Sequence, residues 1–217
     1  MNLQKYKTII FDCDGVVLDS NRVKTQAFYL AALRYGEAAA QALVEHHTAN
    51  GGISRFKKFE YFLNEIVDVR SDESGMQYLL DSYSKEVADG LMQCKIAEGL
   101  EDLRRASPNA KWLIVSGGAQ VELRHVFSER GISDYFDGGI FGSPDPKDTI
   151  FAREIDAGNI EFPALFIGDS RYDHTVSEMF KTDFVFVSAW TEFKGWQDYF
   201  ANTGVTCKSA LSDLITQ

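Results

Sequence analysis

Three carboxylates crowd the end of an apolar run near the start of the chain, in the stretch TIIFDCDGVVLDS at residues 8–20. Asp12, Asp14 and Asp19 follow the apolar residues 9–11. Carboxylates this close repel one another unless a cation or a proton lies between them. Mg²⁺ prefers such hard oxygen ligands, so Asp12 and Asp14 predict a site for this cation. Asp19 lies farther along and is expected to act as a helix cap or hinge residue.

Other residues that could share this chemistry also follow apolar runs. Ser116 comes directly after a second run, Lys147 follows a third, and Asp169 and Asp173 follow a fourth in the stretch FIGDSRYD. In an open parallel sheet, ligands bind beyond the carboxyl ends of the strands. If these runs are parallel strands, the acids, the hydroxyl and the ammonium therefore meet at one edge of the sheet.

Together these residue types fit a site for phosphoryl transfer. Asp12 and Asp169 would supply oxygen ligands for Mg²⁺, and Asp12 could then attack phosphorus to form an aspartyl phosphate. Asp14 could protonate the leaving oxygen and afterwards deprotonate the attacking water. Ser116 and Lys147 would hold the phosphoryl oxygens, where positioning and charge neutralisation supply most of the catalysis.

The elements that must position these residues follow from the alternation of short apolar runs with longer helical patterns. Such alternation is typical of an α/β fold, here a doubly wound, Rossmann-like parallel sheet with helices on both faces. Each apolar run has the length of a buried strand. Strands are expected at residues 8–11, 111–115, 138–141, 164–167 and 184–187.

The interval between the first two expected strands is much longer than a single crossover requires. Residues 20–95 contain several amphipathic helical stretches and no convincing strand. One helix is enough to connect two parallel strands, so this interval predicts a separate helical subdomain inserted into the sheet. The expected division is a catalytic core of residues 1–19 and 96–217 and an inserted cap domain of residues 20–95.

The motifs FDCDGVVLDS, LIVSGG and FIGDSRYD, with a lysine after the third strand, resemble the four motifs of the haloacid dehalogenase superfamily. The similar branch contains sugar-phosphate and phosphoglycolate phosphatases and β-phosphoglucomutase, and its helical cap occupies the same place as the insert. The resemblance implies that Asp12 is nucleophile and metal ligand, and that Asp14 is the acid and base with its main-chain carbonyl on the metal. It implies that Asp169 is a metal ligand, and that Asp173 is a ligand or a supporting acid.

The same resemblance assigns the phosphoryl-binding residues. Ser116 and Lys147 match the family's phosphoryl binders, and Gly117 beside Ser116 is a further candidate for substrate binding. Many relatives carry the lysine directly before a Pro-x-Pro turn, whereas here Ser143 precedes the turn and Lys147 follows it. Lys147 is the one lysine in this connection, so the role is assigned to it.

One cap segment resembles a substrate-reading loop. NGGISRFKKF has two glycines before a basic helix start, as in the cap loop that places an arginine over the substrate in β-phosphoglucomutase-like proteins. Arg55 is the matching residue and a candidate for substrate binding. The alternative is a solvated surface arginine.

The function expected from these residues is an Mg²⁺-dependent phosphatase acting on a small phosphorylated metabolite, such as a sugar phosphate or a phosphoglycolate-like acid. The alternatives are a phosphosugar mutase, which passes the phosphoryl group to a second sugar hydroxyl, and a catalytically silent metabolite-binding protein. Cleavage of a phosphonate in relatives uses a cap lysine, but no motif singles out Lys24, Lys57 or Lys58. Dehalogenation is disfavoured because a departing halide does not need the proton that Asp14 could supply.

Composition restricts the partners. The net charge of −10 and the pI near 4.9 argue against nucleic acid, because no basic run supplies phosphate contacts. No stretch is long enough for a transmembrane helix, so no membrane partner is expected, and the first apolar run is too short for a signal peptide. Three cysteines without paired spacing suit free thiols in a reducing compartment. We expect a cytoplasmic monomer or homodimer.

Overall fold

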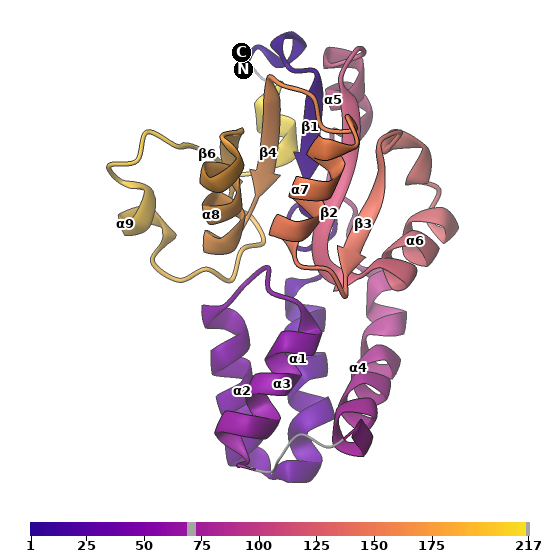
Figure 1. The fold of residues 1–217 in the computed structure, drawn as a ribbon, viewed down its shortest axis with the longest axis vertical. Coiled ribbons are helices and arrows are strands. Elements are labelled where there is room, and N and C mark those ends of the chain that lie inside the picture. Colours follow the sequence, from indigo (N-terminus) through magenta and orange to yellow (C-terminus); the bar gives the residue numbers. More distant parts are fainter. Residues whose placement is uncertain (69–72, 216–217) are drawn as a thin grey trace.

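A six-stranded parallel sheet forms the centre of the protein, whose computed structural model describes residues 1–68 and 73–215. Its strand order is β3-β2-β1-β4-β5-β6 (Figure 1). Thr8 at the start of β1 lies opposite Lys111 of β2 and Ala164 of β4, which aligns the carboxyl ends of the three strands. The strands are β1 Thr8–Phe11, β2 Lys111–Ala119, β3 Gly139–Ser143, β4 Ala164–Gly168, β5 Asp183–Val187 and β6 Thr206–Lys208.

The predicted doubly wound α/β fold is confirmed, with shifts of one or two residues at the ends of β3, β4 and β5 and two larger differences in the strands. β2 continues through the stretch SGG to Ala119, four residues beyond the expected end. The sixth strand, β6, was not expected because it is short, lies at the sheet edge and is only partly buried. A strand that is not buried on both faces lacks the continuous apolar run that marks the others.

Helices cover both faces of the sheet because successive strand residues point to opposite sides. Phe11 packs on one face with Phe127 of α6, whereas Ile10 packs on the other face with Phe151 of α7. Toward the β6 edge of the sheet, Phe200 of α9 contacts Phe186 of β5, with ring centroids 4.8 Å apart. The helices of this core are α5 Leu100–Ala106, α6 Gln120–Glu129, α7 Lys147–Asp156, α8 Arg171–Phe180 and α9 Trp196–Phe200.

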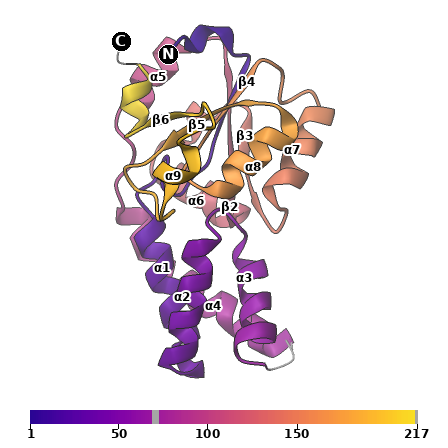
Figure 2. The same ribbon diagram turned by 90° about the vertical axis from the view of Figure 1, so that its left-hand side faces the viewer.

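Four further helices, which we call the cap helices, lie together beyond the carboxyl ends of the central strands (Figures 1 and 2). Their apolar centre includes Phe28, whose ring lies 5.2 Å from that of Phe59 and 4.5 Å from that of Tyr83. No helix within the described ranges is long and apolar enough to cross a bilayer. The cap helices are α1 Asn21–Ala32, α2 Glu37–Ala49, α3 Arg55–Tyr61 and α4 Glu73–Gln93.

The chain crosses between the core and the cap helices at two neighbouring segments. Leu18 and Ile96 form an antiparallel bridge, and the backbone N–H of Asp19 donates to the carbonyl of Lys95 at 2.9 Å. The predicted domain boundaries at 19/20 and 95/96 fall at this crossing and stay a prediction. Short helical turns complete the chain: η1 Leu3–Lys5, η2 Leu33–Tyr35, the π-helical η3 Phe62–Ile66, η4 Ser133–Tyr135 and η5 Leu211–Leu214.

Candidate active site

Three buried carboxylates meet at the carboxyl edge of the sheet, and we call them the carboxylate cluster. Asp12 follows β1, Asp169 follows the neighbouring β4, and Asp173 lies in the first turn of α8. One ligand oxygen from each lies within 4.8 Å of the others. The residues could therefore hold a metal ion, and three carboxylates are a donor set that suits Mg²⁺.

Lys147 balances part of this negative charge. It is the first residue of α7, and its side chain is fully buried. Its Nζ lies 2.9 Å from Asp12 Oδ1 and 2.5 Å from Asp173 Oδ1. Burial alone would lower the pKa of Lys147, but the two carboxylates raise it above its usual value. The structure thus brings Lys147 to the candidate nucleophile although it follows the turn instead of preceding it.

Both carboxylate oxygens of Asp173 are engaged within the protein. Oδ1 contacts Lys147, while Oδ2 accepts hydrogen bonds from the backbone N–H of Ser170 at 3.1 Å and from its hydroxyl at 2.6 Å. The Ser170 hydroxyl in turn accepts from the backbone N–H of Asp173, which completes a capping box at the start of α8. Of the two roles open to Asp173, this geometry favours the supporting acid over the metal ligand.

The electrostatics of the carboxylate cluster leave negative charge that a bound cation could balance. Burial raises the pKa of Asp12 to about 7, against the opposing charge of Lys147. Burial and the neighbouring Asp12 and Asp173 hold the pKa of Asp169 well above its usual range. A single lysine therefore does not stabilise all three negative charges, and a divalent cation would do so.

Asp14 occupies a different environment, two residues after Asp12. Its Oδ2 accepts a hydrogen bond from Lys24 Nζ at 2.6 Å, and its Oδ1 accepts one from the Ser20 hydroxyl at 2.6 Å. Burial would raise the pKa of Asp14, but Lys24 and these hydrogen bonds hold it below its usual value. Asp14 is therefore ionised in this arrangement, which is the form that can accept a proton.

The segment after the central part of β2 carries the remaining candidates. Ser116 is fully buried; its hydroxyl lies 3.5 Å from Asp14 Oδ2 and accepts from the backbone N–H of Gly118 at 3.0 Å. Gly117 lines the cavity described below, and a side chain there would collide with the carbonyl oxygen of Gly52. The loop before α3 is thus pressed against the core at a position where only glycine fits.

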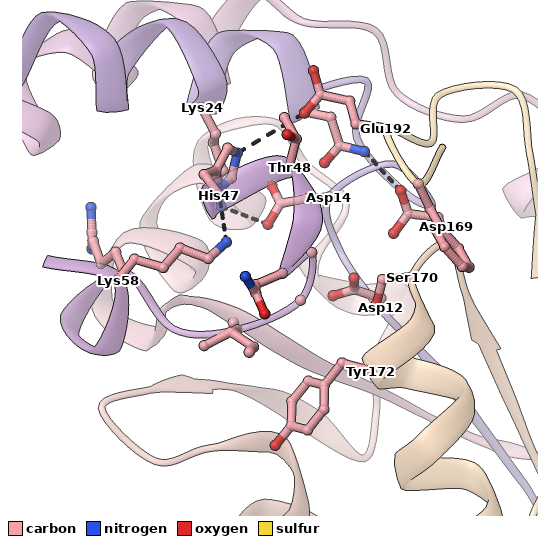
Figure 3. Close-up of a pocket in the computed structure, with 18 of the residues that line it drawn as sticks. Asp12, Asp14, Lys24, His47, Thr48, Lys58, Asp169, Ser170, Tyr172 and Glu192 are labelled. Carbon is pink, nitrogen blue, oxygen red and sulfur yellow. Dashed lines mark hydrogen bonds and ion pairs between the residues drawn. The ribbon is translucent and has the colours of Figure 1, made fainter. Parts of the chain in front are cut away.

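A cavity of about 240 Å³ lies between the core and the cap helices (Figure 3). Asp12, Asp14 and Asp169 line its core side, and Lys58 and His47 line it from the cap helices. Its volume is below the roughly 300–1,000 Å³ typical of pockets for drug-sized ligands. The cavity therefore suits a small metabolite.

Arg55 lines this cavity but is not the solvated arginine of the alternative interpretation, because only 7% of the residue is exposed. Its Nη2 lies 3.2 Å from Glu122 Oε2 on α6, and its Nη1 lies 3.4 Å from the Ser84 hydroxyl. The guanidinium also lies over the ring of Tyr83, 4.8 Å from the centroid. Arg55 thus joins a cap helix to the core through a buried ion pair.

A family model for haloacid dehalogenase-like hydrolases matches residues 6–174. The chain belongs to this family. Similar solved structures include a predicted phosphatase from Clostridium acetobutylicum, with a TM-score of 0.74, 18% identity and 96% of both chains covered. A β-phosphoglucomutase from Clostridium difficile has a TM-score of 0.71 and 19% identity, with 96% of this chain and 92% of that chain covered. The TM-scores show a shared fold, and at identities this low the likeness shows nothing beyond the fold. A comparison with curated protein sequences found no match.

The structure adds residues to the site of this haloacid dehalogenase-like hydrolase that the sequence motifs missed. Lys24 and Lys58 are buried, line the cavity and come from α1 and α3. A signal for each was present, because both lie in apolar stripes with helical spacing, where a lysine is out of place. These stripes are Lys24, Ala27, Phe28 and Ala31 on α1, and Arg55, Lys58, Phe59 and Phe62 on α3 and η3.

Proposed function

We propose that this haloacid dehalogenase-like hydrolase is an Mg²⁺-dependent phosphatase of a small phosphorylated metabolite, with Asp12 as the nucleophile. The observation that carries the proposal is the position of Asp12, which lines a small cavity, lies 2.9 Å from the ammonium of Lys147 and has a carboxylate oxygen within 4.8 Å of one of Asp169. Asp14, two residues on, lines the same cavity.

Asp12 and Asp169 would hold the metal, together with the main-chain carbonyl of Asp14. Bound Mg²⁺ would neutralise charge on the carboxylates and on the phosphoryl oxygens. Asp173 would support the site by fixing Lys147 and the start of α8. The buried donor set and the raised pKa of Asp169 support this assignment.

The proposed reaction has two displacements at phosphorus. In the first, a carboxylate oxygen of Asp12 bonds to phosphorus while the bond to the leaving oxygen breaks. Asp14, which is ionised in the free site, would take up a proton from solvent before this step and give it to that oxygen. In the second, ionised Asp14 takes a proton from water, the water oxygen bonds to phosphorus, and Asp12 leaves. Lys24 stabilises the ionised form of Asp14 that the second step needs.

The remaining residues would position the phosphoryl group and the substrate. Lys147 and the hydroxyl of Ser116 would hold phosphoryl oxygens, and Gly117 would let the substrate approach the backbone. Arg55 retains N–H donors beyond those bonded to Glu122 and Ser84, and these could contact the substrate. The three cysteines are free thiols, which supports a reducing, cytoplasmic setting.

The test is a panel of phosphorylated sugars and short phosphorylated acids, assayed with Mg²⁺ and with a chelator. We expect inorganic phosphate to be released from a subset of the panel only when Mg²⁺ is present, and no release by Asp12→Asn protein. Formation of a sugar-phosphate isomer without free phosphate would establish the mutase instead. Tight binding of a panel compound without any turnover would establish a silent binding protein.

A further inference from the structure

Lys58 stands out among the buried cations around the cavity. Lys24 pairs with Asp14 and Arg55 pairs with Glu122, but Lys58 makes no ion pair with a carboxylate of the described residues. Only 2% of Lys58 is exposed, and it lines the cavity. Its Nζ lies 2.7 Å from Nδ1 of His47 on α2. A buried ammonium without a counter-charge is costly, so this arrangement needs a reason.

The protonation state of His47 is determined by a chain of hydrogen bonds. The Thr25 hydroxyl donates to the Glu192 carboxylate at 2.6 Å, so its oxygen accepts from Nε2–H of His47 at 3.1 Å. Because the pKa of His47 lies well below its usual value, the ring carries one proton, on Nε2, and Nδ1 accepts a hydrogen bond from Lys58. Burial and the nearby Lys58 keep the pKa of His47 well below its usual value. His47 thus orients Lys58 as a neutral acceptor and does not neutralise it.

Charged groups around Lys58 leave it short of negative charge. Burial and then Lys24 lower the pKa of Lys58 to about 7, while Asp14 and Glu192 oppose the shift and Lys147 adds to it. An anion in the cavity would supply the missing counter-charge and raise this pKa again. Binding of an anion beside Lys58 would therefore be coupled to protonation of its amine.

The place of Lys58 in the cavity determines which part of a substrate it would meet. Lys58 and His47 lie on the side of the cap helices, whereas Asp12 and Asp169 lie on the core side (Figure 3). A short molecule whose phosphoryl group is at Asp12 would extend toward Lys58. We infer that Lys58 binds a second anionic group of the substrate, a carboxylate or a second phosphate. This inference rests on the proposed phosphatase function and narrows its substrates to short-chain metabolites that carry a second anionic group besides the phosphoryl group.

The test compares three substrates that differ in the second group: 2-phosphoglycolate, ethane-1,2-diol bisphosphate and ethyl phosphate. We expect Lys58→Met to lower kcat/KM for one of the first two by about tenfold to a hundredfold more than for ethyl phosphate, the loss of one charged hydrogen bond. The compound with the larger loss identifies carboxylate or phosphate as the second group. Lys58→Arg should restore much of the preference. Lys57→Met is the matched control, because Lys57 pairs with Glu60 on the exposed face of α3.

A pH series separates charge recognition from a structural role. The preference of the wild-type protein for the compound with a second anionic group over ethyl phosphate should fall as pH rises above about 7, where free Lys58 loses its proton. Lys58→Arg should retain the preference to higher pH, because arginine stays charged. Equal losses on all three substrates, or a pH-independent preference, would overturn the inference.

Direct binding keeps the inference separate from the proposed chemistry. Calorimetric titration of Asp12→Asn protein, with Mg²⁺ present, should show that 2-phosphoglycolate or the bisphosphate binds at least about tenfold more tightly than ethyl phosphate. The additional Lys58→Met substitution should remove this difference. If no substrate is hydrolysed but this preference is found, the phosphatase proposal fails and the anion site stands. If turnover occurs but neither binding nor kcat/KM depends on Lys58, the anion site fails alone.

Discussion

The two sides of the cavity differ in their uncompensated charge: it is negative on the core side and positive on the side of the cap helices. On the core side, the carboxylates of Asp12, Asp169 and Asp173 lie close together, and Lys147 pairs with only Asp12 and Asp173 among them. On the side of the cap helices, Lys58 has only the neutral His47 as its partner. A metal ion would balance the first side and an anion the second. On the proposed function, the core would supply the chemistry and the cap helices would select the substrate.

The largest effect should come from the core side. Asp12→Asn removes the nucleophile and keeps the side-chain shape, so kcat should fall by at least about a thousandfold while the melting temperature changes little. Steady-state phosphate release and thermal unfolding measure the two quantities. Asp102→Asn is the control, because Asp102 is an exposed residue on α5. Full activity in pure Asp12→Asn protein would contradict the assignment of Asp12 as the nucleophile.

A second prediction concerns the metal. Asp169→Asn keeps a similar shape and removes one negative charge, so the Mg²⁺ concentration for half-maximal activity should rise by about tenfold to a hundredfold. Ca²⁺ should substitute poorly, because it prefers more ligands at longer distances than Mg²⁺. Activity measured over a range of each metal tests both statements. Activity that is indifferent to a chelator would contradict the metal assignment.

A third prediction tests the ion pair that crosses between the two sides. Arg55→Met leaves Glu122 partly buried without its partner and should lower the free energy of unfolding by about 2–3 kcal/mol. Arg55→Met combined with Glu122→Leu should be less destabilised than the sum of the single changes, as measured by urea unfolding. An unchanged unfolding free energy in Arg55→Met, together with a higher KM, would make Arg55 solely a substrate contact.

The last prediction concerns the uncompensated charge of Lys58. In the unfolded chain Lys58 stays protonated up to about pH 10.5, but in the folded protein only up to about pH 7. The unfolded state binds the extra proton between these values, so the cost of burying Lys58 is complete below pH 7 and shrinks as pH rises. Without ligand, the melting temperature of Lys58→Met relative to wild type should therefore fall by about 5–10 °C from pH 6.5 to pH 9, which corresponds to about 2.5 kcal/mol.

Thermal unfolding of Lys58→Met, wild type and Lys57→Met across this pH range measures the effect. Lys57→Met should follow the wild type at every pH, since Lys57 is exposed. A difference that stays constant with pH would mean that the charge of Lys58 is already balanced in the folded protein.

The core side of the site was largely predictable because its residues are tied to single strands. The run TIIF is buried on both faces and could form only an interior strand, so Asp12 had to follow at the carboxyl edge. Asp169 follows a run of the same kind in β4. Because parallel strands align their carboxyl ends, local patterns were enough to bring the two acids together. β6 escaped the same reasoning because its residues are only partly buried.

The sequence by itself determined the α/β fold, the strand-end acids and the helical insert, because each depends on periodicity within a short segment. Only the tertiary structure decided the partners of Lys24, Arg55 and Lys58. Each of these cations meets a residue from another element: Asp14 after β1, Glu122 on α6 and His47 on α2. Such pairs depend on how the cap helices pack on the core and on one another. Helical spacing reveals that a lysine is buried, but the balance of its charge is decided by residues far away in the sequence.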